Sequence, residues 1–547
     1  MKKIIFILGL AAVVLGTSCS DVLDLNPADR FSPATVWSTT TTADKYVIGL
    51  YSIFGANTEM RGGDAYASPR LSDAYSDILK STSWNQYNHN FNATLLQETA
   101  FNSNSAGAFE CWSSHYDRIR RENEFLRDAA EFGRKFGEDW LKIRIAEVRF
   151  CRAYAYFMLC RVYGGVILRT EVDGPEQNDK ARSTEEECWG FIINELKELA
   201  PDLPLKWDSD NSGRATQKAA YGLLSRVALY AEKWDVAAQA ARDCATAEGN
   251  LDLSKNGYAK IFELGINSPE VLFAVEFKSS VIDHAYDAYV RPSGDTKELG
   301  KQVYSGFVPT SELVDSYEMA GDGGNFSWEK HGKDPYANRE PRFYATILYN
   351  GADWMGRKIE SFVGGKDGYK AYENAGAAGT TVTGYYLRKY LIDGDKTWVT
   401  SGSGQDWIVL RYAEVLLNKA EALAMENWNK NSAEALQALN DVRARVGLPA
   451  RATADKETFL EYVRHERKVE LAGEGFRYWD LRRWRLAEKV IDGQNVHGVK
   501  ISKQSDGSFT YEQVDADGGV ERRFAVDYGV NFEVADGRAE LFTYDGE

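Results

Sequence analysis

Histidine and cysteine are scarce in this chain of 547 residues, with six of each. The histidines are scattered, and no two of them stand at metal-ligand spacing. No cysteine pair forms a CxxC motif, so neither a zinc site nor a redox site is indicated. The HExxH, GxSxG and Walker signatures are also missing, as is a GxGxxG loop between a strand and a helix. The sequence therefore predicts no catalytic residues, no metal site and no cofactor.

The chain also has no excess of basic over acidic residues. The chain has 65 lysines and arginines against 81 aspartates and glutamates, a net charge of −16. Nucleic-acid binding depends on neutralising phosphates with basic side chains. We therefore expect no nucleic-acid partner.

Long apolar runs are confined to the start of the chain. Ile4–Leu15 follows two lysines, is too short to span a bilayer comfortably, and leads through small residues to Cys19. This pattern predicts a signal peptide over residues 1–18 and a lipid on the thiol of Cys19, with a tether over residues 19–40. The alternative is an ordinary secretory peptide that is cut nearby. Removal of the peptide leaves 63 basic against 81 acidic residues, a net charge of −18.

The other cysteines are odd in number, and all lie in segments with helical patterning. We expect buried free thiols, although an exported chain leaves one or two disulfides possible. These residues are Cys111, Cys151, Cys160, Cys188 and Cys244.

Helical periodicity is the strongest pattern that is present. Apolar residues recur at spacings of three and four, as in Ala220, Leu223, Leu224 and Val227, and such segments come in pairs. The pairs resemble degenerate tetratricopeptide repeats, which must stack to bury their apolar faces. The expected units are Trp140–Ala200, Arg214–Ala247, Tyr412–Val446 and Lys456–Val490.

Two segments interrupt this helical pattern, at about 55–105 and about 250–406. They are rich in Gly, Asn, Asp, Tyr and Trp, and we interpret them as folded, loop-rich insertions. The prediction is a mainly α protein: one domain over residues 41–547, with repeat helices at about 140–247 and 411–490 and a few short strands.

The segment Glu466–Trp484, ERKVELAGEGFRYWDLRRW, concentrates charged and aromatic residues. Glu461 precedes Arg464 by three positions, and Arg467 precedes Glu470 by three, so each pair is expected to be adjacent on a helix surface. Acids interleave with the arginines, which favours ion-paired packing over a nucleic-acid surface. We expect replacement of Trp479 to impair folding before it impairs binding.

A short acidic segment, Asp208–Gly213, imitates the start of an EF-hand loop. The twelfth position is Ala219 instead of the glutamate that such a site needs. We interpret this segment as a polar turn.

Several motifs together resemble the SusD/RagB family, the surface glycan-binding lipoproteins of Bacteroidetes-type bacteria. They are LDLNPADRFSPATVW, IRIAEVRFCRAYAYFMLCRVYGGVIL, GRATQKAAYGLLSRVALYAEKW, RYAEVLLNKAEAL and ERKVELAGEGFRYWDLRRW. The resemblance implies a non-catalytic protein anchored by lipid in the outer membrane and exposed at the cell surface. It also implies that the protein captures glycans and passes them to a TonB-dependent, SusC-like transporter.

Two departures from the family pattern stand out. Gly473 replaces a large aromatic residue, and the usual Pro-Ile-Pro-like ending is not evident in Gly507–Glu547.

The loop-rich insertions are the expected source of ligand contacts, because sugar faces stack on aromatic rings and hydroxyls bind polar side chains. The same architecture binding peptides or glycopeptides is the alternative, and a hydrolase is a third, less favoured one. The candidate residues are Arg70, Asp73, Asp77, Trp84, Tyr87, Asn90, Tyr286, Tyr289, Arg291, Trp328, Tyr336 and Trp354.

Overall fold

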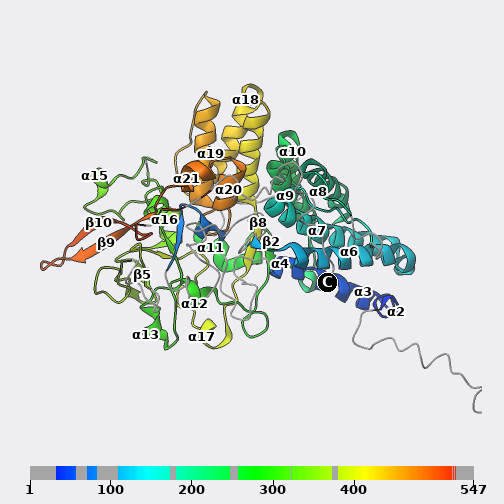
Figure 1. The fold of residues 1–547 in the computed structure, drawn as a ribbon, viewed down its shortest axis with the longest axis horizontal. Helices are drawn as coiled ribbons and strands as arrows, with labels where there is room; N and C mark the ends of the chain where they lie inside the picture. Colours follow the sequence, from blue (N-terminus) through cyan, green and yellow to red (C-terminus); the bar gives the residue numbers. More distant parts are fainter. Residues whose placement is uncertain are drawn as a thin grey trace, which may run out of the picture.

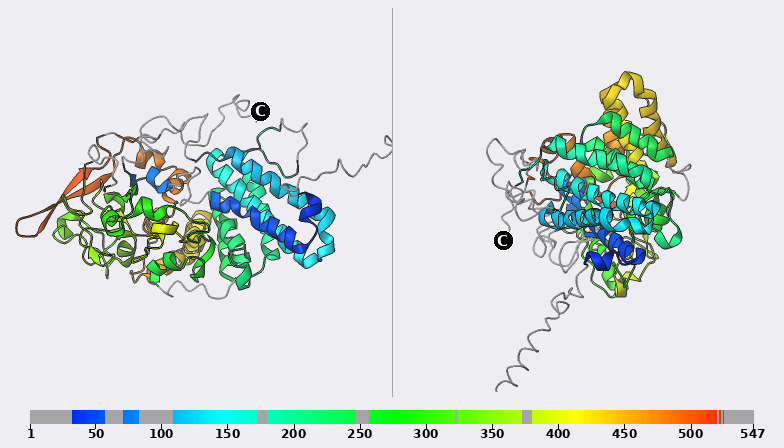
Figure 2. Two further views of the ribbon diagram at one scale, coloured as in Figure 1. Left: turned by 90° about the horizontal axis from the view of Figure 1, so that it is seen from below. Right: turned by 90° about the vertical axis from the view of Figure 1, so that its right-hand side faces the viewer.

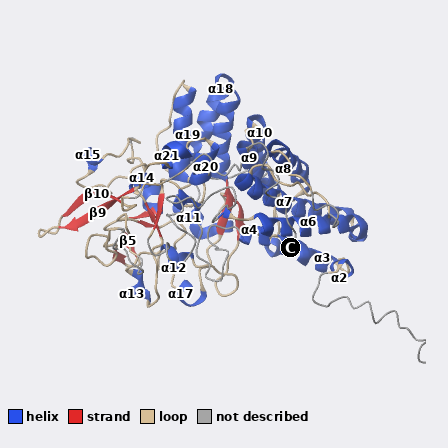
Figure 3. Ribbon diagram, in the orientation of Figure 1, coloured by secondary structure: helices blue, strands red, loops and turns tan. Residues whose placement is uncertain are grey.

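The computed structural model describes residues 32–56, 71–82, 109–172, 180–246, 257–321, 323–371, 380–519, 521–522 and 524. Helices dominate this part of the chain, and its strands are short (Figure 3). The longer helices are α3 (Thr40–Leu50), α6 (Trp112–Phe132), α7 (Glu138–Tyr163), α8 (Glu185–Leu199), α9 (Gln217–Tyr230), α10 (Trp234–Thr246), α11 (Gly257–Leu264), α18 (Tyr412–Arg445) and α19 (Lys456–Glu470). The shorter ones are α2 (Pro33–Val36), α4 (Ser52–Ala56), α12 (Tyr286–Val290), α13 (Asp295–Leu299), α14 (Ser311–Val314), α15 (Trp328–His331), α16 (Pro341–Thr346), α17 (Trp398–Ser401), α20 (Arg477–Arg483) and α21 (Ala487–Ile491).

The scaffold is a row of stacked helices. α6 packs on α7, α7 on α8, α8 on α9 and α9 on α10, and α10 then contacts α18, which packs on α19. Figure 1 shows this row running from the right of the molecule to its top, and Figure 2 shows α3 lying along α6 and α7. The predicted mainly α, helical-repeat fold is confirmed.

Local sequence signals set the helix ends. The Thr184 hydroxyl accepts a hydrogen bond from the N–H of Glu187, and the Glu187 carboxylate accepts one from the N–H of Thr184, a capping box that starts α8. α7 ends at Gly164, whose φ of 67° suits glycine. Within α18, Asn427 leaves the helical conformation at φ −164° and ψ 93°. This kink divides α18 into the two arms that the apolar spacing predicts for Tyr412–Val446.

The described part of the segment at about 250–406 carries most of the short strands. Five two-stranded antiparallel sheets pair β1 with β3, β2 with β8, β4 with β7, β5 with β6, and β9 with β10 among the described residues. The β9–β10 hairpin projects at the left of Figure 1. The strands are β1 (Leu79–Ser81), β2 (Val271–Val275), β3 (Phe307–Pro309), β4 (Ile347–Leu348), β5 (Asp353–Trp354), β6 (Arg357–Lys358), β7 (Tyr386–Leu387), β8 (Trp407–Arg411), β9 (His497–Lys503) and β10 (Phe509–Asp515).

The smaller predictions can be followed in the same structure. The five cysteines after Cys19 are buried free thiols, and Asp208 caps a short turn over Ser209–Asn211. Cys19 itself and residues 1–31 lie outside the described residues. Across the described part of the chain, no helix combines the length and apolarity needed to cross a membrane.

Candidate functional site

Asp73 and Asp77, two of the predicted ligand contacts, hold the junction segment Glu466–Trp484 in place. Asp73 is buried and accepts hydrogen bonds from the N–H groups of Gly473 (2.9 Å), Gly475 (3.2 Å) and Arg477 (2.9 Å). Burial raises the pKa of Asp73 to about 6, although these donors oppose the shift. Asp77 pairs with Nε of Arg477 at 2.8 Å and with Nζ of Lys468 at 3.1 Å. Both carboxylates are therefore occupied by protein groups.

The candidates from the second insertion lie mainly in the interior. The Arg291 side chain is fully enclosed, donates to Asp287 at 2.8 Å, and lies 5.2 Å from the ring centre of Trp354. Trp354 in turn donates to Asp295 at 3.0 Å. These side chains are enclosed in this structure, and their role as ligand contacts stays a prediction. They are Tyr286, Tyr289, Arg291, Tyr336 and Trp354.

Trp328 differs from these, because it is only partly buried and donates to Asp315 at 2.9 Å. Four further candidates lie outside the described residues and stay predictions: Arg70, Trp84, Tyr87 and Asn90.

The acids of the junction segment are ion-paired and buried, as the interleaved charges predict, and their partners include arginines from outside the segment. Arg342 donates to Glu466 at 2.6 Å and to Glu470 at 2.9 Å, and Arg411 donates to Glu470 at 2.6 Å and to Glu474 at 2.7 Å. All five side chains are buried.

The two predicted helix-surface pairs have different outcomes. Arg464 and Glu461 are paired at 2.5 Å. The prediction that Arg467 pairs with Glu470 is wrong. Both side chains are buried in the core, where Arg467 pairs with Asp480 at 2.8 Å instead.

Gly473 departs from the family pattern for a backbone reason. It has φ 77°, a conformation that side-chain-bearing residues rarely adopt, and its N–H donates to Asp73. A Cβ there has room, because its nearest neighbour is Leu387 at 3.5 Å. The turn between α19 and α20 therefore requires glycine for its conformation.

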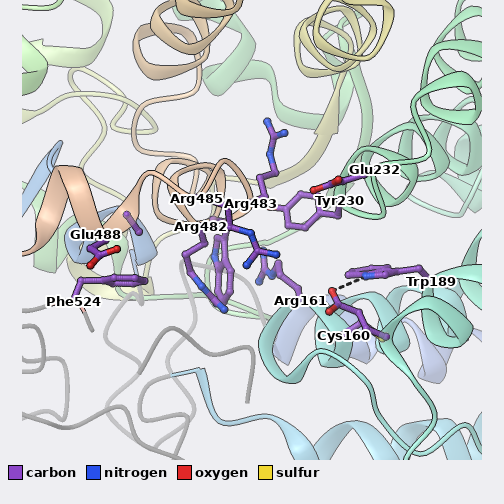
Figure 4. Close-up of a pocket in the computed structure, with 13 residues that line it drawn as sticks. Cys160, Arg161, Trp189, Tyr230, Glu232, Arg482, Arg483, Arg485, Glu488 and Phe524 are labelled. Atoms are coloured by element: carbon purple, nitrogen blue, oxygen red, sulfur yellow. Dashed lines mark hydrogen bonds between the residues drawn. The ribbon is translucent and has the colours of Figure 1, made fainter. Parts of the chain in front are cut away.

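An accessible cavity of about 230 Å³ lies between the repeat helices and α20 (Figure 4). We call it the arginine–tryptophan cavity. Its walls come from α7, α8, α9, α20 and α21, and they include Arg161, Trp189, Tyr230, Trp479 and Arg482. An adjoining cavity of about 200 Å³ shares Tyr230, Glu232, Arg483 and Arg485 with it. The two together form one extended hollow beside α20.

Two arginines of this cavity stack on Trp479. The guanidinium carbon of Arg161, in the last turn of α7, is 4.1 Å from the Trp479 ring centre, and that of Arg482 is 5.2 Å away. Figure 4 shows Arg161 and Arg482 reaching into the same space. Trp479 is 2% exposed, and its ring centre lies 4.8 Å from that of Phe109. This packing supports the expectation that replacement of Trp479 impairs folding.

This cavity was not predicted from the sequence, which placed the ligand contacts in the loop-rich insertions. Trp479 and Arg482 belong to the junction segment, but Arg161, Trp189 and Tyr230 come from distant repeat helices. Their convergence depends on how the helices stack, for which the sequence carries no local signal.

A third cavity, of about 270 Å³, lies beside α6. It is lined by Trp112, Tyr116, Arg120 and Asn123 together with the chain that follows α7. Trp112 and Tyr116 lie 5.0 Å apart between ring centres. This cavity also combines aromatic rings with polar groups.

The arginine–tryptophan cavity is lined by aromatic rings, guanidinium groups and the carboxylates of Glu185, Glu232 and Glu488. Its one thiol, Cys160, is buried, and burial raises the pKa of that thiol well above the ordinary value, which disfavours a nucleophilic thiolate. Among the described residues, no three His, Cys, Asp or Glu side chains are grouped closely enough to hold a metal ion. Aromatic faces and guanidinium groups are what the cavity offers to a ligand.

Comparisons with known proteins cover nearly the whole chain. The family model described as "SusD family" matches residues 269–521, and the one described as "Starch-binding associating with outer membrane" matches residues 21–229. A SusD-like protein of Bacteroides ovatus is 25% identical over 98% of this chain and 94% of its own length.

Solved structures share the fold. The crystal structure of a SusD-like protein from Bacteroides fragilis is 26% identical, covers 92% of this chain and 95% of its own, and superposes with a TM-score of 0.77. A second B. fragilis structure, described as a SusD-like carbohydrate-binding protein, is 24% identical, with 90% and 97% coverage and a TM-score of 0.73. By these matches and by its stacked-helix fold, the chain belongs to the SusD/RagB family.

Proposed function

We propose that this chain is a non-catalytic, glycan-binding protein of the bacterial cell surface. The observation that carries the proposal is the arginine–tryptophan cavity, which opens to solvent and offers aromatic rings beside side-chain donors. Sugars bind proteins through stacking of their C–H faces on rings and through hydrogen bonds to their hydroxyls. Family membership and the carbohydrate-binding description of a protein with the same fold support the same function.

The proposal includes further ligand contacts outside the cavity. Trp328 is the described candidate that keeps an accessible edge, and Arg70, Trp84, Tyr87 and Asn90 complete the set. These residues are proposed as ligand contacts separate from the cavity.

Affinity electrophoresis tests the glycan proposal. The mature chain is run through native gels that contain starch, laminarin, pectin or a sulfated galactan. We expect retardation by at least one polysaccharide relative to a gel without glycan. No retardation by any polysaccharide, together with binding to a peptide mixture, would establish the peptide-binding alternative instead.

Anchoring and delivery form the second part of the proposal. Cys19 carries a lipid that holds the protein in the outer membrane, and the captured oligosaccharide passes to a TonB-dependent, SusC-like transporter. Detergent extracts of outer membranes that contain the tagged full-length chain should yield such a transporter on affinity purification. A Cys19→Ala variant is the control, and we expect it to be lost from the membrane fraction.

A further inference from the structure

Arg161 and Arg482 differ from the other arginines near them because neither has a charged partner. Within the described residues, neither side chain donates a hydrogen bond or forms an ion pair, and Nε of Arg161 and Nη1 of Arg482 are buried without a partner. Arg483, the next residue on α20, pairs with Asp480 at 2.8 Å and with Glu421 at 2.5 Å. Arg477, at the start of the same helix, is paired with Asp77, so α20 carries two paired guanidinium groups and one without an ion pair.

The carboxylates around the cavity do not neutralise these two arginines. Glu185 accepts a hydrogen bond from the Trp189 ring at 2.9 Å, and Glu232 and Glu488 are exposed. Burial lowers the pKa of Arg482, and the nearby charges of Arg161 and Arg485 lower it further. Positive charge is therefore in excess around this guanidinium group. A bound anion would offset that excess.

An unpaired buried charge is costly, so such groups are normally paired. The guanidinium group binds carboxylates and sulfates through two parallel hydrogen bonds, which makes it suitable for planar or multidentate anions. The rings of Trp189, Tyr230 and Trp479 line the same space, and Arg161 and Arg482 already lie over the ring of Trp479. Together these groups match a molecule that has both a negative group and a stackable ring.

We infer that the arginine–tryptophan cavity binds the acidic group of an anionic sugar unit, either a uronate carboxylate or a sulfate ester. This inference rests on the proposed function, because it names the class of glycan that is bound. The volume of about 230 Å³ is below the range of roughly 300–1,000 Å³ that drug-sized ligands occupy, so the cavity suits one sugar unit of a longer chain.

Calorimetric titration of the full mature chain with matched oligosaccharide pairs tests this inference. One pair is an oligogalacturonate and its carboxyl-reduced form, and the other is a sulfated galactan oligosaccharide and its desulfated form. We expect one acidic member to bind about 10-fold or more tightly than its neutral counterpart, with an affinity that falls as salt concentration rises. The pair that shows this difference identifies the anion as carboxylate or sulfate.

Two variants on different helices connect the preference to the cavity. Arg482→Gln and Arg161→Gln should each weaken the acidic ligand about 10-fold or more and weaken the neutral ligand by a smaller factor. Both should keep a melting temperature close to that of the wild type, because each side chain is only partly buried and forms no ion pair. Arg242→Gln is the matched control: it removes the same charge from an exposed pair with Glu434, outside the cavities described above, and should bind like the wild type.

Two results overturn the inference, and they can be told apart. Equal affinity for acidic and neutral members, or acidic binding that both arginine variants retain, refutes the anionic preference and leaves glycan capture intact. Failure of every oligosaccharide and polysaccharide to bind refutes the inference and the proposed function together.

Discussion

Arg411 lies at the centre of the buried charge network that joins the loop-rich insertion to the last helices. Its guanidinium donates to Glu270 at 2.9 Å, to Glu470 at 2.6 Å and to Glu474 at 2.7 Å, and the residue is 1% exposed. A buried ion pair adds little net stability over apolar packing, but the loss of one partner leaves the other charge unpaired. The network therefore favours one arrangement of these segments over others.

Replacement of Arg411 tests this interpretation. We expect Arg411→Met to lower the free energy of unfolding by ~3–5 kcal/mol, because it leaves Glu470 and Glu474 with fewer partners inside the protein. Chemical denaturation followed by circular dichroism measures the change. Arg242→Met removes an exposed partner of Glu434 and should cost ~0–1 kcal/mol. Equal losses for the two variants would contradict the assigned role of the buried network.

Glu122 on α6 is a buried carboxylate whose oxygens both lack a hydrogen-bond partner. Burial raises its pKa to about 8 from an ordinary value near 4.5, although Arg152 and Arg118 oppose the shift. The folded protein therefore holds this proton more tightly than the unfolded chain. The stabilisation that the protonated Glu122 contributes is fully present below about pH 4.5 and is lost as the pH rises toward about 8.

A Glu122→Gln variant should remove this pH dependence. At pH 8.5 we expect the free energy of unfolding of the variant to exceed that of the wild type by ~1–3 kcal/mol, and the difference should shrink toward pH 4.5. Denaturation curves collected between those pH values measure it. Glu131→Gln, an exposed change on the same helix, should show no such trend. A difference for Glu122→Gln that stays constant with pH would refute the explanation.

At the scale of elements, the turn between α19 and α20 connects the junction segment to the first insertion. Asp73 lies about 400 residues before this turn in the sequence and accepts hydrogen bonds from three of its backbone N–H groups. The turn can present these donors because Gly473 and Gly475 adopt φ values of 77° and 80°. Its backbone conformation therefore positions α20, which carries Trp479 and Arg482.

A Gly473→Ala substitution should strain this turn. Because the site has space for a methyl group, the expected loss of ~1–2 kcal/mol in unfolding free energy comes from the positive φ alone. Gly190→Ala is the matched control, since Gly190 lies within α8 with open space around it and the change should stabilise the helix by ~0.5–1 kcal/mol. Thermal unfolding that shifts in the same direction for both variants would contradict this account.

Helices with strong periodicity could be predicted from the sequence almost to their ends. The pair predicted within Tyr412–Val446 is present as α18 with a kink at Asn427. The direction in which charged side chains point was harder to predict. Glu470 and Arg467 have helix-surface spacing, yet both are buried, because Arg342 and Arg411 from other segments pair with Glu470, and Asp480 on α20 pairs with Arg467. Tertiary pairing of this kind leaves no trace in local spacing.

At the scale of the whole molecule, the family and the stacked-helix fold could be predicted, whereas the cavity could not. The predicted ligand contacts were chosen because aromatic and polar residues are dense in the insertions. In the described part of those insertions, residues such as Arg291 and Trp354 serve the interior instead. The rings and the arginines without ion pairs lie where α7, α8 and α9 meet α20, a junction that forms only when the chain is folded.

Capture without cleavage is the central claim, and one measurement tests it directly. The mature chain is titrated calorimetrically with oligosaccharides of the polysaccharide that retards it most, and the recovered sugar is then analysed by mass spectrometry. The account predicts saturable binding and oligosaccharides of unchanged length. The absence of binding, or the appearance of shorter products that one carboxylate substitution abolishes, would contradict it.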